Sequence, residues 1–154
     1  MSNEQQGAFG ESLFEVAITR GYLFRPQHLG GNWPTSDFYV ELNGLNEKLF
    51  FIVQVKSSIR GYDKNGNLRI QVPKSKLNQL RNYFAPTYLA GVDIPGEKIY
   101  LTAINFVATK DVNKISTTFE VNAQTLKTLY QEVQHFWQHS GLKTYKEQYK
   151  HVML

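Results

Sequence analysis

The sequence predicts one compact α/β domain. Its 154 residues fit the usual size of a single domain and suffice for a hydrophobic core. Hydrophobic residues make up 42% of the chain and aromatic residues 14%, as is typical of globular proteins. Segments with helical spacing alternate with short apolar runs in the order helix, strands, helix, strands, helix. This order indicates an α/β arrangement.

The first element is a predicted helix over residues 8–20. Helical spacing gathers apolar side chains on one broad face: Phe9, Leu13, Phe14, Val16, Ala17 and Ile18. Gly21 ends the segment. Glu11 lies beside Phe14 and Ile18 at the border of the apolar arc, so we expect it to reach a cleft from the edge of the core.

Strands and two further helices follow. Short runs rich in apolar or β-branched residues predict strands over residues 22–27, 36–43, 48–57, 68–72, 88–93 and 98–106. Turn residues separate them at Asn43-Gly44, 61–67 and 94–97. Pro73 opens a helix over about 74–84, and a last helix covers 122–139 with an apolar stripe of Leu126, Leu129, Val133, Phe136 and Trp137. With no repeat or linker in the sequence, we expect residues 1–154 to form a single domain.

Several classes of protein are excluded by composition. No apolar run approaches the ~20 residues of a membrane span, and the N-terminus lacks the basic and apolar regions of a signal peptide. The absence of cysteine excludes disulfides and thiolate metal sites. We therefore expect a cytoplasmic protein without a membrane segment.

The net charge of +4 is unevenly distributed along the chain. Residues 1–53 hold three basic and six acidic side chains, whereas residues 54–81 hold seven basic side chains against Asp63 alone. A concentrated basic segment is what a surface that binds a polyanion requires. A solvated basic loop is the alternative.

The most informative segment is an apolar run that continues into Gln54-Val55-Lys56. Because side chains alternate along a strand, Gln54 and Lys56 point to one side and Val55 to the other. A lysine that closes an apolar strand loses hydration unless a cleft or a solvent-facing strand end receives it. Asp37, one strand earlier, is the acid expected to share that cleft. Carboxylate, amide oxygen and ammonium at one strand end indicate a metal site for phosphate chemistry.

This order of residues resembles the PD-(D/E)XK, or restriction-endonuclease-like, nuclease superfamily, which includes archaeal Holliday-junction resolvases and small bacterial defence-associated nuclease domains. The segment Gly7-Ala-Phe-Gly-Glu11 resembles the family's helical motif, Ser36-Asp37 the strand with the acid, and Gln54-Val-Lys56 the E/Q-x-K strand. The resemblance covers about residues 7–106. It implies a restriction-endonuclease-like α/β fold, in which a mixed central sheet is flanked by helices.

The resemblance also implies an activity, namely cleavage of DNA phosphodiester bonds with Mg²⁺, or Mn²⁺ in its place, in phage defence or in DNA repair and recombination. Asp37, Gln54 and the backbone carbonyl of Val55 would bind the metal, and Glu11 would support its waters or a second ion. Lys56 would act on the attacking water or on the phosphate.

The implied partner is duplex or branched DNA. The basic segment supplies the side chains expected to contact phosphates: Lys64, Arg69, Lys74, Lys76 and Arg81. Such contacts position a nucleic acid without specifying its sequence. Analogy with small nucleases that cut both strands implies a homodimer.

Two departures from the family pattern leave alternatives open. Ser36 replaces a proline that shapes the backbone, and Gln54 replaces the commoner glutamate, which removes one negative charge from the metal site. A catalytically degenerate module that still binds nucleic acid is the second hypothesis, and an aromatic-rich protein-interaction domain is the third. Taken singly, Asp37 could cap a turn, Lys56 could extend to solvent, and Glu11 could be a first-turn acid that the helix dipole favours.

Other metal chemistries fit the sequence poorly. His135 and His139 are spaced four residues apart on a predicted helix, yet no glutamate follows His135 as a zinc protease requires. The segment 63–67 begins like a calcium loop, but Lys74 occupies the position of the bidentate glutamate.

Overall fold

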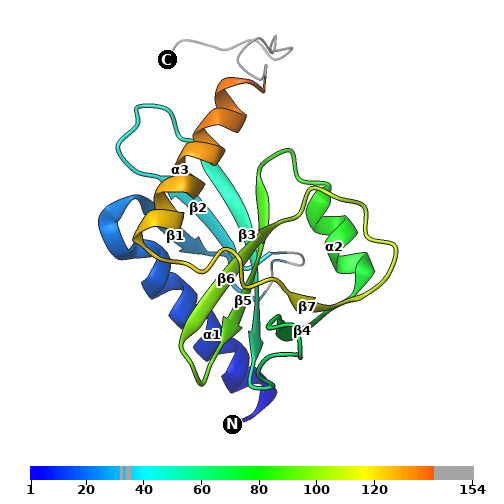
Figure 1. Ribbon diagram of the computed structural model, residues 1–154. Coiled ribbons are helices and arrows are strands. Elements are labelled where there is room, and N and C mark those ends of the chain that lie inside the picture. The colour runs from blue at the N-terminus through cyan, green and yellow to red at the C-terminus, as the bar shows by residue number, and fades with distance from the viewer. Residues whose placement is uncertain (32, 34–35, 141–154) are drawn as a thin grey trace.

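The computed structural model describes residues 1–31, 33 and 36–140 (Figure 1). The elements in chain order are α1 (Asn3–Thr19), the 3₁₀ turn η1 (Arg20–Tyr22), β1 (Phe24–His28), β2 (Phe38–Leu42), β3 (Phe50–Ser58), β4 (Leu68–Val72), α2 (Lys74–Arg81), β5 (Thr87–Asp93), β6 (Lys98–Ala103), β7 (Val112–Ile115) and α3 (Ala123–Gln138).

A five-stranded sheet forms the centre of the molecule, in the order β1-β2-β3-β5-β6. Strands β3 and β5 are parallel, and every other neighbouring pair in this sheet is antiparallel. The parallel pair needs a crossover, which the segment containing β4 and α2 provides. The predicted α/β class, a mixed central sheet flanked by helices, is confirmed.

The two faces of this sheet are covered differently (Figure 1). Helices α1 and α3 cover one face, where Phe14 and Leu129 join a cluster with Val53 and Val55 of β3. On the other face lie α2 and a two-stranded antiparallel sheet of β4 and β7, which we call the β4–β7 ribbon. Leu89 of β5 belongs to this second cluster. As predicted, Val55 therefore faces one layer while Gln54, its neighbour in β3, faces the other.

The structure corrects the prediction for the first helix in two respects. Helix α1 begins at Asn3 rather than at residue 8, because Ser2 caps it and exchanges hydrogen bonds with Gln5 in a capping box. Its buried stripe consists of Gly10, Phe14 and Ile18, spaced four residues apart. Phe9 and Val16, expected on the core face, are 39% and 55% exposed. The helix is therefore rotated so that Gly10, and not Phe9, faces the core.

Strand β7 is not among the strands that the sequence predicts. Its four residues are Val-Asn-Lys-Ile, of which only Ile115 is buried, so the segment has too few apolar side chains to register as a strand. The predicted strand over residues 98–106 ends at Ala103, and the helix predicted to reach residue 84 ends at Arg81. In the part of the chain that the structure describes, no helix has both the length and the apolarity to cross a bilayer.

Candidate active site

The candidate site lies where β2 begins and β3 continues beyond it, paired only with β5 on its other side. Strand β2 pairs with β3 from Phe38 opposite Val53, and the Asp37 N–H still donates to the Val53 carbonyl at 2.9 Å. Since backbone groups alternate in direction along a strand, Val55 faces the same side as Val53, where β2 offers no further partner. The Val55 N–H and C=O are left for side chains to satisfy.

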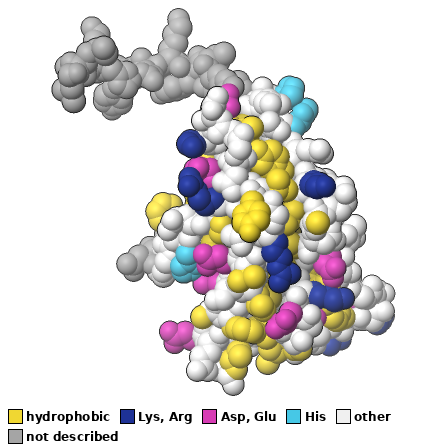
Figure 2. Space-filling view, turned by 90° about the vertical axis from the view of Figure 1, so that its left-hand side faces the viewer, with side chains coloured by type: hydrophobic (Ala, Val, Ile, Leu, Met, Phe, Trp, Pro, Cys, Tyr) yellow, Lys and Arg dark blue, Asp and Glu magenta, His cyan; other side chains and the backbone are white. Residues whose placement is uncertain are grey.

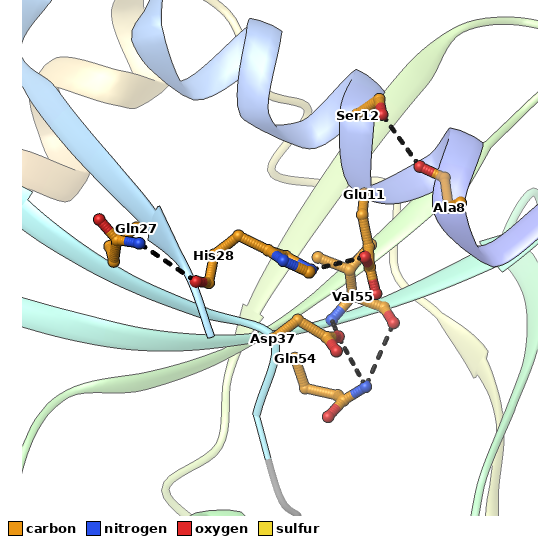
Figure 3. Close-up of polar contacts among 8 residues, drawn as sticks. All are labelled: Ala8, Glu11, Ser12, Gln27, His28, Asp37, Gln54 and Val55. Carbon is orange, nitrogen blue, oxygen red and sulfur yellow. Dashed lines mark hydrogen bonds and ion pairs between the residues drawn. The ribbon is translucent and has the colours of Figure 1, made fainter. Parts of the chain in front are cut away.

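Asp37 and Gln54 satisfy those two groups (Figure 3). Asp37 Oδ2 accepts a hydrogen bond from the Val55 N–H at 2.7 Å and a second from Gln54 Nε2 at 2.8 Å. Gln54 Nε2 also donates to the Val55 carbonyl oxygen at 3.3 Å. The amide nitrogen thus lies between the two oxygens expected to bind a metal. The Gln54 oxygen would reach a metal there only after its terminal amide rotates, a soft torsion.

Glu11 reaches the same place from α1. Its Oε2 is 2.8 Å from His28 Nε2, at the end of β1, and the His28 ring lies against Phe38 at 5.2 Å between ring centres. Burial raises the pKa of Asp37 above its ordinary value of 3.8, and the Glu11 carboxylate adds to this rise. The hydrogen bond from Val55 and the charge of Lys56 oppose it. Two carboxylates held this close favour a cation between them.

Lys56 is the last of the predicted site residues in this region. It follows Gln54 by two residues in β3, so both side chains project from the same face of the sheet. Gln54 is buried, whereas Lys56 is half-buried and keeps contact with solvent. Asp37 therefore has a cation as well as a carboxylate among its charged neighbours, and Lys56 remains accessible to a phosphate.

The contacts of three residues in this region were not predicted from the sequence. His28 lies one residue beyond the predicted strand over residues 22–27, and extending that strand would have placed it opposite Phe38. Gly10 lies under Ser57: a Cβ at Gly10 would stand 1.7 Å from Ser57 Oγ, so only glycine lets α1 approach β3 this closely. Ser57 Oγ itself is buried without a hydrogen-bond partner among the described residues.

The predicted phosphate-contacting residues occupy the layer formed by the β4–β7 ribbon and α2. Lys64 is exposed in the turn before β4, Arg69 is exposed on β4, and Lys74 and Arg81 are exposed at the two ends of α2. Lys76 is half-buried. Figure 2 shows the opposite side of the molecule, over α1 and α3, where Lys and Arg side chains are interspersed with Asp and Glu around an apolar stripe.

The donor set fits a hard divalent cation. Mg²⁺ prefers oxygen ligands and binds through one or two carboxylates while keeping several waters. Asp37, Glu11 and the Val55 carbonyl supply such oxygens. Burial and the Glu11 carboxylate both raise the pKa of Asp37, and a bound cation would relieve this destabilisation of the charged form. Within the described residues, no three His, Asp or Glu side chains form a metal-binding group by themselves. A metal here would thus depend on the Val55 carbonyl and Gln54.

Comparison with solved structures identifies a nuclease among the proteins of similar fold. The chain is similar to the bacterial homing endonuclease I-Ssp6803I, with a TM-score of 0.57 and 14% sequence identity, over 89% of this chain and 97% of that chain. At this identity the likeness shows the fold alone. No family model matches the chain, and no curated protein matches it.

Proposed function

We propose that this chain is a metal-dependent DNA endonuclease with a PD-(D/E)XK-type site. The observation that carries the proposal is the convergence of Asp37 and Gln54 on the backbone of Val55, with Glu11 and Lys56 as the charged neighbours of Asp37. The fold shared with a homing endonuclease supports the same class of activity. DNA is the proposed substrate, and a homodimer, with one site for each strand, is the proposed assembly.

Each residue has a role in this proposal. Asp37, the Val55 carbonyl and Glu11 would hold Mg²⁺ or Mn²⁺, with the Gln54 oxygen as a further donor after rotation of its amide. The ion would polarise the scissile phosphate and lower the pKa of the attacking water. Lys56, half-buried on β3 and still in contact with solvent, would donate to the phosphate oxygen on which negative charge grows. His28 holds the Glu11 carboxylate in place.

Cleavage of supercoiled, linear and four-way-junction DNA with Mg²⁺ or Mn²⁺ tests this function. Asp37→Asn and Lys56→Met preserve side-chain size while removing the charge, and each should lower the cleavage rate by about 10²-fold or more. Lys127→Ala, at an exposed position of α3, is the control and should cut like the wild type. Metal-dependent cutting that survives both Asp37→Asn and Lys56→Met would disprove the assignment.

A second function is favoured by one particular contact. Gln54 donates to both Asp37 and Val55, so its amide nitrogen stands where a cation would bind and satisfies the oxygens without one. A nuclease-fold module that binds nucleic acid without cutting it is consistent with this contact. DNA binding that weakens steeply with salt but brings no cleavage would favour this module. Failure to bind nucleic acid at low salt would favour a protein-interaction domain instead.

A further inference from the structure

The β4–β7 ribbon has an apolar inner face and a polar outer face. Along β4, Leu68, Ile70 and Val72 are buried against the central sheet, whereas Arg69 and Gln71 alternate with them and are exposed. Arg69 pairs directly with Lys114 of β7, which is also exposed. The outer face therefore presents two cations side by side.

This pairing is unfavourable unless an anion lies on the ribbon, since like charges opposite one another destabilise a sheet. Among the described residues, neither Arg69 nor Lys114 takes part in an ion pair. Asp63 is a carboxylate near Lys114, but it accepts hydrogen bonds from the backbone N–H groups of Asn65 and Asn67 in the preceding turn. Asp63 offsets part of the charge of Lys114, and the charge of Arg69 is left for a ligand to neutralise.

The surrounding segments extend this positive surface. Residues 54–81 and 107–118, which contain the ribbon and α2, together hold nine basic and two acidic side chains. The rest of the chain is net negative, and Figure 2 shows mixed charges over α1 and α3. A ligand with many negative charges is therefore favoured on the ribbon side of the molecule.

The ribbon also lies beside the candidate active site. Its inner residues Leu68 and Ile115 pack on Gly91 of β5, where a Cβ would stand 3.3 Å from Leu68 and 2.6 Å from Ile115. Gly91 is the partner of Lys56 in the parallel β3–β5 pair, and neighbouring strands are about 4.8 Å apart. The inner face of the ribbon therefore adjoins the strand pair that carries Lys56, and its outer face lies one layer, about 10 Å, further out.

We propose that the β4–β7 ribbon enters the major groove of duplex DNA and reads base edges. A two-stranded ribbon fits that groove, and arginine or lysine recognises guanine there while asparagine or glutamine recognises adenine. The exposed residues of the ribbon are of these four types: Arg69, Gln71, Asn113 and Lys114. The pairing of β4 with β7 shifts between Arg69 and Val72, and such a bulge increases twist and redirects side chains.

This inference rests on the proposed action on DNA but adds sequence selectivity, which phosphate contacts do not provide. It is tested by binding rather than cleavage. The Asp37→Asn protein is incubated with a randomised duplex library, and the bound fraction is sequenced. Arg69→Lys, Gln71→Ala and Lys114→Ala are then compared in the same background. Arg69→Lys keeps the charge and removes the bidentate fork that recognises guanine.

We expect a preferred duplex whose advantage over a duplex altered at one or two base pairs falls about tenfold or more in Arg69→Lys. Binding to random-sequence duplex should change little, and Lys127→Ala should keep the preference. Duplex RNA should show no preference, because its major groove is too narrow for side chains. Binding without any preferred sequence, a preference unchanged in all three ribbon variants, or no binding to DNA would each overturn the inference.

Cleavage by the wild type distinguishes the two proposals. Metal-dependent cutting without base preference would support the proposed endonuclease and overturn the proposed base readout by the ribbon. If the wild type does not cut DNA but its base preference changes in the ribbon variants, the base readout is supported and the endonuclease proposal is overturned.

Discussion

Replacing Gln54 by glutamate should make the stability of the protein depend on metal. Gln54 is only 6% exposed, and its Nε2 donates to Asp37 Oδ2 at 2.8 Å and to the Val55 carbonyl at 3.3 Å. Gln54→Glu replaces this donor with an oxygen, so each hydrogen bond becomes a contact between two acceptors unless a proton or a cation lies between them.

The size of the effect follows from that geometry. Two full charges 2.8 Å apart repel by about 6 kcal/mol at an effective dielectric constant near 20. Keeping a proton on a glutamate of ordinary pKa costs only about 3.7 kcal/mol at pH 7. The introduced carboxyl should therefore stay protonated and donate to Asp37, with a cost of at most about 4 kcal/mol at pH 7.

The stability of Gln54→Glu should fall as pH rises and should increase when metal binds. The pKa of the introduced carboxyl is higher in the folded than in the unfolded chain, so stability is intact below about pH 4 and falls as pH rises above that value. A divalent cation replaces the proton. At about a hundred times its Kd it should restore about 2.7 kcal/mol.

Urea unfolding at about pH 5 and about pH 8, with and without Mg²⁺, measures both effects. Gln131→Glu makes the same change at an exposed position of α3 and should respond to neither variable. Mg²⁺ should stabilise Gln54→Glu more than the wild type. Equal stabilisation of the two proteins, or a variant whose stability does not fall between the two pH values, would refute this reasoning.

Three further substitutions probe the same region. Because burial raises the pKa of Asp37, the stability of the wild type decreases as pH rises above 3.8. The thermal midpoint of Asp37→Asn relative to that of the wild type should therefore increase from about pH 4 to pH 7. A difference between the two midpoints that stays constant with pH would contradict this. Gly10→Ala should lower the free energy of unfolding in urea by about 1–3 kcal/mol, because the new methyl group clashes with Ser57. The double variant Gly10→Ala, Ser57→Gly should recover part of this loss. Additive losses in the double variant would exclude the clash. His28→Ala frees Glu11 and should weaken Mn²⁺ binding about 10- to 100-fold by calorimetric titration, and unchanged affinity would remove the positioning role of His28.

The central sheet could be predicted because its strands carry strong local signals. The apolar run before Gln54 and the apolar run over residues 88–93 are long enough to indicate buried strands, and both were predicted to within a residue or two. The alternation of Val55 and Gln54 also follows from strand geometry alone.

Other features depend on contacts between distant parts of the chain, which local patterns do not encode. The rotation of α1 that exposes Phe9 is set by Gly10 packing on Ser57, 47 positions further along the sequence. The pairing of Glu11 with His28 requires β1 and α1 to be adjacent, and a single histidine at a strand end has no signature of its own. The amide orientation of Gln54 is likewise determined by Asp37 and the unpaired backbone of Val55.

The early end of β2 has a consequence for the integrity of the molecule. An unpaired strand edge is a template for another chain, through which folded proteins swap segments or aggregate. Beyond Val53, β3 presents such an edge, and side chains block it: Asp37 and Gln54 at Val55, and Gln6 at the Ser57 carbonyl. The residues proposed to bind metal therefore also occupy the backbone groups through which a strand of another chain could pair at this edge.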